Sequence, residues 1–243
     1  MMRTEASGTA GGPERLLVVD QVSLSYPGSV GRAALDSVDL AVEAGAFVAL
    51  LGRSGSGKSS LLNLVAGLDR PSRGRVTVAG TAISDLPETA LARWRAVGIG
   101  IVFQFFQLLP SLTIAENVML PMDFAGVIPR RGRRVRALDL LDQVGIAEQA
   151  DKWPATLSGG QQQRAAVARA LANDPPLVLA DEPTGNLDSA SAQAVIGLLA
   201  GLAGAGRTVL VATHDRDLAA RAGRIVRLAD GRIERDQLVA VSA

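Results

Sequence analysis

The chain has 243 residues, of which 48% are hydrophobic, a formal net charge of +1 and no cysteine. This composition excludes a fibrous or disordered protein, a disulfide-stabilised scaffold and a thiolate metal site. The balanced charge gives no overall field that would attract nucleic acid, and the length suits one large α/β domain.

The chain starts with a polar, glycine-containing segment, residues 1–14, which predicts a flexible tail and lacks the apolar core of a signal peptide. The longest apolar run, residues 194–206, is shorter than the roughly 20 residues that a bilayer crossing needs. Within it, Gly197 and Gly201 form a GxxxG spacing, which outside a membrane indicates a close-packed helix. We expect a cytoplasmic protein that meets a membrane only from its side.

Short β-rich runs recur along the chain. The early ones alternate apolar and polar residues, which is typical of half-exposed antiparallel strands, whereas "FVALL", "LVLA" and "VLVAT" are continuously apolar and suit central parallel strands covered by helices. The sequence "ADGR" near the end predicts a hairpin turn. The predicted strand regions are residues 16–26, 38–52, 75–80, 97–104, 176–183, 207–215 and 223–236.

Helical patterns dominate the middle of the chain, where Pro110, Pro121, Pro129 and Pro154 act as punctuation. We predict one unit over residues 15–240. A β subdomain and core occupy about 15–104 and 173–236, and a helical subdomain is inserted at about 105–172.

The segment "GRSGSGKSS" matches the phosphate-loop pattern G-x-x-x-x-G-K-[ST] and stands between an apolar strand and a helical run, as the motif requires. Its glycines let successive backbone N–H groups face a phosphate chain, Lys58 reaches the β and γ phosphates, and the Ser59 hydroxyl suits Mg²⁺. The alternative is a glycine-rich turn that binds no ligand. The predicted nucleotide-binding residues are Gly52, Arg53, Ser54, Gly55, Ser56, Gly57, Lys58, Ser59 and Ser60.

Two carboxylates follow the apolar strand of "LVLADEP". The carboxyl ends of parallel strands are where open α/β sheets bind ligands. Asp181 therefore fits the Walker B position that holds Mg²⁺, and Glu182 fits the base that polarises the attacking water. The alternative is a pair of carboxylates capping a solvent-exposed turn.

His214, the only histidine, and Gln104 also end predicted strands. We expect His214 to sense the γ phosphate or stabilise its transition state, and the Gln104 amide to meet Mg²⁺ or the attacking water. A lone histidine is more often structural, and an isolated glutamine would carry no meaning.

The stretch "LSGGQQQR" begins a predicted helix. Ser158, Gly159 and Gly160 would offer a hydroxyl and bare N–H groups at a helix N-terminus, which suits an anion such as phosphate. The alternative is a loop followed by an ordinary helix start.

Together the phosphate loop, "FQ", "LSGGQ", "LADEP", "GNLD" and "THD" resemble, in order and spacing, an ABC-type ATPase over residues 16–236. The resemblance implies a P-loop NTPase core with a parallel central sheet, an antiparallel β subdomain and an inserted α-helical subdomain. It also implies that Ser158, Gly159, Gly160 and Gln161 bind the γ phosphate of a nucleotide held by a second copy, with Asp188 at the dimer seam. Tyr26 resembles the aromatic residue that stacks on adenine, although strand packing explains it equally well.

The finer resemblance is to the branch that contains the ATPases of lipoprotein release, macrolide export and cell division. Arg53, Ser60 and Gln107 depart from common residues of the family without removing a catalytic group. The resemblance implies that the segment after Gln104 docks on a membrane protein. The apolar residues of this segment are Phe105, Phe106, Leu108 and Leu109. Ordinary subdomain core is the alternative for these four. The basic run at 130–136 suits either lipid head groups or a solvated helix face.

The sequence therefore predicts an Mg²⁺-dependent ATPase that binds ATP, dimerises with a second copy and drives an integral membrane permease from the inner face of the membrane. The alternatives are force transmission to an extracytoplasmic enzyme and a soluble ABC ATPase acting on nucleic acid or ribosomes. We expect no nucleic-acid partner, because the charge is balanced and no coiled-coil insertion is present.

Overall fold

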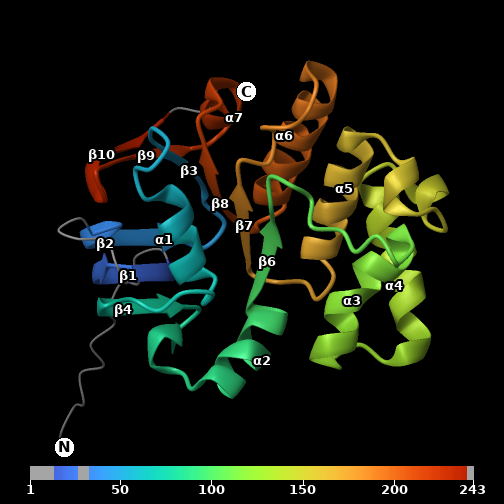
Figure 1. Ribbon diagram of the computed structural model, residues 1–243, viewed down its shortest axis with the longest axis horizontal. Coiled ribbons are helices and arrows are strands. Elements are labelled where there is room, and N and C mark those ends of the chain that lie inside the picture. Colours follow the sequence, from blue (N-terminus) through green and yellow to red (C-terminus); the bar gives the residue numbers. More distant parts are fainter. Residues whose placement is uncertain (1–13, 27–32, 240–243) are drawn as a thin grey trace, which may run out of the picture.

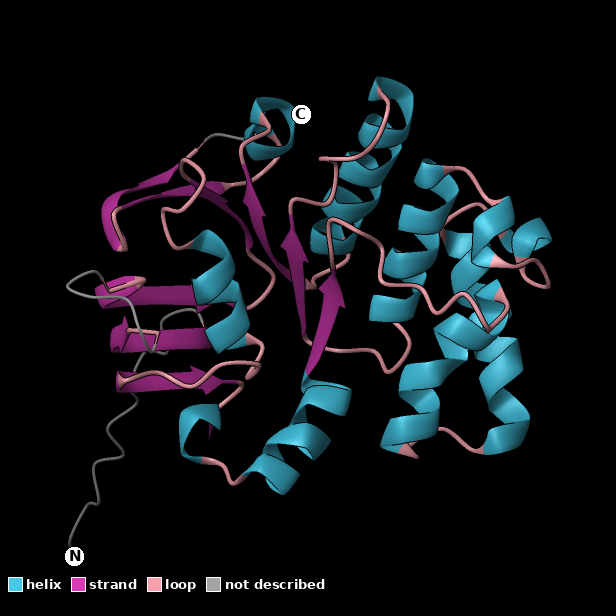
Figure 2. Cartoon of the chain, in the orientation of Figure 1, coloured by secondary structure: helices cyan, strands magenta, loops and turns pink. Residues whose placement is uncertain are grey.

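The computed structural model describes residues 14–26 and 33–239. The predicted tail, except Glu14, lies outside these residues, as do residues 27–32 and 240–243. Figure 1 shows two sheets flanked by helices, and Figure 2 colours the same view by secondary structure.

The strands form a four-stranded antiparallel sheet in the order β2-β1-β4-β5 and a six-stranded sheet in the order β10-β9-β3-β8-β7-β6. In the larger sheet, neighbours from β9 to β6 pair in parallel, and β10 pairs with β9 antiparallel through the predicted turn. The predicted α/β fold class is correct. The strands are β1 (Arg15–Leu24), β2 (Leu35–Glu43), β3 (Phe47–Leu51), β4 (Arg73–Val78), β5 (Thr81–Ala82), β6 (Ile99–Val102), β7 (Leu177–Asp181), β8 (Thr208–Thr213), β9 (Arg224–Ala229) and β10 (Arg232–Leu238).

Central strands β3, β7 and β8 are apolar over most of their length, as suits strands with both faces covered. Nearly every residue in these strands is buried. One apolar core lies between the two sheets, and another joins the large sheet to the helices beyond it. In β1 and β2, buried and more exposed positions alternate along much of each strand, as the sequence pattern predicts.

Helix α1 follows β3 and lies between the two sheets, whereas α3, α4 and α5 gather on the far side of the large sheet (Figure 1). This places α5 against both β6 and α6. The helices are α1 (Lys58–Val65), α2 (Glu88–Gly98), α3 (Ile114–Ala125), α4 (Arg130–Gln143), α5 (Gly159–Ala170), α6 (Ser189–Gly204) and α7 (Arg216–Ala220).

Pro121 does not end a helix, contrary to the prediction that it acts as punctuation. Helix α3 begins with a capping box between Thr113 and Glu116, runs through Pro121 and ends at left-handed Gly126. Val118 and Met122 on the same helix are fully buried. Their burial offsets the one helical hydrogen bond that proline cannot donate.

The prediction that Gly197 and Gly201 mark a close-packed helix is wrong. Both lie in α6, but a Cβ built on either glycine would meet no atom within 4 Å. The apolar side chains Val195, Ile196 and Leu199 attach α6 to the sheet instead, so the glycines occupy its outer face. Among the described helices, none has the length and apolar character that a membrane crossing requires.

Candidate active site

The phosphate loop, residues 52–60, connects β3 to α1 and adopts the sharp turn that its glycines allow. Gly57 has φ of 105° and a Cβ there would lie 2.7 Å from the carbonyl oxygen of Ala34. Only glycine therefore fits this position without displacing the backbone of Ala34. The first N–H groups of α1 have no acceptor inside the helix, and they begin at this loop.

Lys58 lies inside the loop with 8% of its surface exposed. Its Nζ donates to the carbonyl oxygens of Gly52 at 2.8 Å and Arg53 at 3.3 Å. It lies 3.8 Å from Oε1 of Glu182. The ammonium is thus held by two backbone carbonyl oxygens of the phosphate loop. It lies between this loop and the carboxylate that follows β7.

Asp181 ends β7 next to the phosphate loop. Burial raises the pKa of its carboxyl above the ordinary value, while a hydrogen bond from Ser59 opposes that rise. Its Oδ1 is buried and accepts no hydrogen bond from the residues that the structure describes. A half-satisfied carboxylate beside a serine hydroxyl offers two hard oxygen ligands at one place.

Glu182 and His214 meet across the neighbouring strands β7 and β8. The Nδ1 atom of His214 lies 2.9 Å from Oε2 of Glu182, and the backbone N–H of His214 donates to the same oxygen at 3.2 Å. The carboxyl ends of β3, β7 and β8 thus bring Lys58, Asp181, Glu182 and His214 together, at an edge that we call the catalytic edge.

Gln104 follows β6 at the same end of the sheet. The Asn186 side chain donates to its carbonyl oxygen at 3.0 Å. A Cβ built on Gly185 would lie 2.9 Å from Nε2 of Gln104, so the amide rests against the turn that follows Glu182. Within the part of the chain that the structure describes, no hydrogen bond joins Gln104 to the phosphate loop.

The signature segment, Ser158–Gln161, begins α5 with a capping box. The Ser158 hydroxyl accepts from the Gln161 N–H at 3.3 Å, and Gln161 Oε1 accepts from the Ser158 N–H at 3.0 Å. This explains the serine and the glutamine as an ordinary helix start, which was the alternative interpretation. Gly159 and Gly160 add first-turn N–H groups without side chains.

Among the described residues, the neighbours of Gly159 and Gly160 in the signature segment lie outside the phosphate loop of the same chain. The atoms nearest to a Cβ on Gly159 or Gly160 belong to Phe106, Asn186, Leu187 and Ser191. Asp188 caps α6 beside this segment, accepting from the N–H of Ser191 at 3.0 Å and from its hydroxyl at 2.7 Å, and these bonds lower the pKa of Asp188.

Tyr26 lies just beyond the end of β1 with 42% of its surface exposed, so it is not part of the buried face of the strand. Its hydroxyl donates to Asp69 at 2.9 Å and lies 3.5 Å from Ser60. Burial is the main cause that raises the pKa of this phenol. The ring is therefore close to the end of the phosphate loop.

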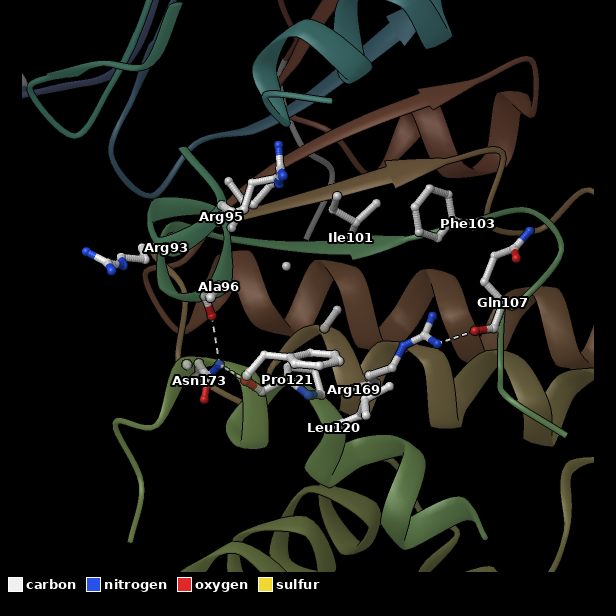
Figure 3. A pocket seen from close by; sticks show the side chains of 16 residues that line it. Arg93, Arg95, Ala96, Ile101, Phe103, Gln107, Leu120, Pro121, Arg169 and Asn173 are labelled. Carbon is white, nitrogen blue, oxygen red and sulfur yellow. Dashed lines mark hydrogen bonds between the residues drawn. The ribbon is translucent and has the colours of Figure 1, made fainter. Parts of the chain in front are cut away.

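A groove of about 670 Å³ opens between α2 and β6 on one side and α3 and α5 on the other (Figure 3). It is lined by apolar residues, including Ile101, Phe103 and Leu120, together with arginines. Arg169 donates to the carbonyl oxygens of Phe106, at 2.8 Å, and Gln107, and burial lowers the pKa of its guanidinium.

The groove differs in part from the docking region predicted after Gln104. From that segment Gln107 lines it, whereas the apolar residues at 105, 106, 108 and 109 do not. Phe105 is 67% exposed, and Leu108 packs against the core as the alternative interpretation held. In the basic run, Arg133, Arg134 and Arg136 pair within the chain, which favours a helix face over a lipid-binding patch.

Sequence reasoning missed Gln163, whose side chain is fully buried. It shares the buried face of α5 with Gly160 and Val167, at helical spacings of three and four residues. A polar residue at an otherwise apolar helical position was the sequence signal that could have identified it. This signal was weak because Gln163 follows two other glutamines.

The comparisons with known proteins agree with this geometry. A family model described as ABC transporter matches residues 35–185. An uncharacterized ABC transporter ATP-binding protein of Mycobacterium tuberculosis is 49% identical over 207 residues, covering 85% of this chain and 83% of that protein. The macrolide export ATP-binding/permease protein MacB of Rhodospirillum rubrum is 46% identical over 224 residues, which cover 92% of this chain but 34% of that protein.

Among solved structures, an ATP-binding cassette that is dimeric, in a post-hydrolysis state and bound to ADP and Pi gives a TM-score of 0.85 at 41% identity. The similarity covers 92% of this chain and 99% of that chain. The chain is therefore a member of the ABC transporter family, an ATP-binding cassette with the P-loop fold and an ATPase.

Proposed function

We propose that the chain is the motor subunit of a membrane complex, which dimerises on ATP and drives a separate permease to export or extract a substrate. The observation that carries this proposal is the catalytic edge, where the Glu182 carboxylate lies 3.8 Å from Lys58 Nζ and 2.9 Å from His214 Nδ1. The proposed unit spans residues 15–240, with a helical subdomain at about 105–172.

In this proposal the phosphate loop binds the triphosphate of ATP and Tyr26 stacks on the adenine. Lys58 exchanges its contacts with the Gly52 and Arg53 carbonyls for the β and γ phosphates, which are stronger acceptors because they are charged. The exposed ring of Tyr26 beside Ser60 supports a position near the base.

The residues present also fit Mg²⁺. Ser59 and Asp181 supply a hydroxyl and a carboxylate oxygen, both hard ligands, and Gln104 supplies an amide oxygen on the same side. The Oδ1 atom of Asp181 is buried without a hydrogen-bond donor among the described residues, and burial raises the pKa of this carboxyl. Both features are expected of a carboxylate whose counter-charge comes from a bound cation. Bound Mg²⁺ would neutralise charge that develops on the phosphates.

We assign the general base to Glu182 and the positioning of the γ phosphate to His214. The carboxylate accepts from His214 and lies near Lys58, so its orientation is fixed from two sides. A base held in this way polarises water without reorganising at the moment of reaction.

We propose further that the signature segment serves the nucleotide of a second copy, with Asp188 at the seam. Two observations support this arrangement: the neighbours of Gly159 and Gly160 lie outside their own phosphate loop, and a relative of similar fold is dimeric with ADP and Pi bound. In such a dimer the first-turn N–H groups of α5 would meet the partner's γ phosphate.

The groove is the proposed docking site of the permease. The relative from Rhodospirillum rubrum is named an ATP-binding/permease protein and is about three times as long as the match to this chain, which supports a partnership of cassette and permease. An apolar groove with a half-buried arginine fits an apolar partner segment. The cassette would then lie peripherally on the inner face of the membrane.

The test is Glu182→Gln, which keeps the size of the side chain and removes the base. We expect hydrolysis to fall by about 100-fold or more, while binding of ATP persists and a dimer accumulates. Hydrolysis is measured by phosphate release, and the dimer by size-exclusion chromatography with Mg-ATP. Glu234→Gln, on exposed β10, is the matched control and should behave as the wild type. Wild-type hydrolysis by Glu182→Gln would refute the base assignment.

A further inference from the structure

Gln163 connects α5 to the segments that directly follow β6 and β7. Its Nε2 donates to the carbonyl oxygen of Pro183 at 2.7 Å and to that of Phe103 at 3.3 Å. Pro183 follows Glu182, and Phe103 precedes Gln104. One amide therefore holds the peptide groups beside two proposed active-site residues.

Two carbonyl acceptors fix the orientation of this amide, because exchanging its oxygen and nitrogen would set oxygen against oxygen. The Oε1 atom is buried and accepts no hydrogen bond from the described residues. An unpaired buried acceptor costs free energy that an apolar side chain of similar size would not incur. The glutamine therefore has a role besides stabilising the fold.

The same helix begins with the signature segment, barely one turn before Gln163. Farther along α5, Arg169 binds the carbonyl oxygens of Phe106 and Gln107. Consequently the segment from Phe103 to Gln107 is attached to α5 at both of its ends. A displacement of α5 would carry this segment with it and would also pull on Pro183.

We propose that Gln163 is a positioning residue that couples the two nucleotide sites of the dimer. This inference rests on the proposed function, in which α5 of one chain meets the nucleotide held by the other. Engagement of the signature by the partner's nucleotide moves α5, and Gln163 transmits that movement to Glu182 and Gln104, which serve the nucleotide of its own chain. Gln163 itself touches neither nucleotide.

Gln163→Leu removes both donors while keeping a similar volume. We expect kcat to fall by about 100-fold, as a small misplacement of reacting groups does, with little change in the KM for ATP. The Hill coefficient for ATP should fall from between 1 and about 2 in the wild type to about 1, because the sites no longer act together. In the Glu182→Gln background the Mg-ATP dimer should still form.

Gln162→Leu is the matched control. Gln162 lies next to Gln163 on the same helix, and its amide donates to the Leu157 carbonyl at 3.1 Å instead of reaching the catalytic edge. This control should keep both kcat and the Hill coefficient. Thermal melting of every variant shows whether its fold is intact, and Gln163→Met replaces Gln163→Leu if leucine unfolds the chain.

The proposal is overturned if Gln163→Leu keeps the wild-type kcat and Hill coefficient, or if Gln162→Leu loses them equally. It is also overturned if the wild type shows a Hill coefficient of 1, or if both leucine and methionine prevent folding, which would make Gln163 purely structural. Absence of a Mg-ATP dimer in Glu182→Gln alone would instead refute the proposed function.

Discussion

Glu182 has φ of 44°, a backbone conformation that non-glycine residues seldom adopt. The surrounding contacts determine it: the Glu182 N–H donates to Ala212 of β8 at 2.8 Å, its carboxylate accepts from His214, and the next carbonyl is bound by Gln163. Strain of this kind costs about 1–3 kcal/mol and persists at functional sites when the surroundings enforce it. It turns the Glu182 carboxylate toward the phosphate loop.

The turn after Glu182 leaves space for Gln104 only because Gly185 has no side chain. In Gly185→Ala the new methyl would lie 2.9 Å from Gln104 Nε2 and 3.4 Å from the Glu182 carbonyl oxygen, so the amide must move. We expect kcat to fall by about 10-fold to 100-fold with ATP binding retained, measured by steady-state hydrolysis and nucleotide titration. Gly204→Ala, which meets no atom within 4 Å, is the control. An unchanged kcat would contradict the role of Gln104.

At the scale of elements, the apolar strands and the phosphate loop were predictable because burial and motif coincide there. Helix α2 was not predicted, since Leu91 is its one fully buried side chain and its pattern is correspondingly weak. Pro121 and the glycines of α6 gave wrong predictions for a related reason. In both cases the local sequence signal was overridden by tertiary packing. Only the tertiary structure determines which face of a helix is buried.

The outer face of α6 gives a stability prediction. Glycine inside a helix costs about 0.5–1 kcal/mol relative to alanine. Gly197→Ala should therefore raise the melting temperature by about 2–4 °C for each kcal/mol gained, because its methyl meets no atom within 4 Å. Gly100→Ala is the matched opposite, since its Cβ would lie 2.1 Å from the carbonyl oxygen of Ala170. Differential scanning calorimetry measures the melting temperature of both variants. Shifts of the same sign in the two variants would contradict this account.

At the scale of the whole molecule, the sequence predicted which strand ends meet but not what holds them. The side chain of Gln163 reaches residues 20 and 60 positions away, and no local pattern encodes those partners. The order of the motifs could be read from the sequence, whereas the neighbours of the signature segment could not. Those neighbours depend on how α5 packs on β6 and α6.

The dimeric arrangement can be separated from nucleotide binding with two variants. Gly159→Asp adds a negative charge at the first position of α5, which the helix dipole tolerates and which repels a phosphate. In the Glu182→Gln background it should abolish the Mg-ATP dimer while the chain still binds ATP, because the phosphate loop is intact. Lys58→Ala should lose nucleotide binding itself.

As a control, Gly197→Asp places the same charge on the open face of α6 and should leave the dimer intact. Size-exclusion chromatography and titration with a fluorescent ATP analogue measure the two properties independently. If Gly159→Asp lost ATP binding as completely as Lys58→Ala, both groups would grip the nucleotide within one chain, and the arrangement across two copies would be wrong.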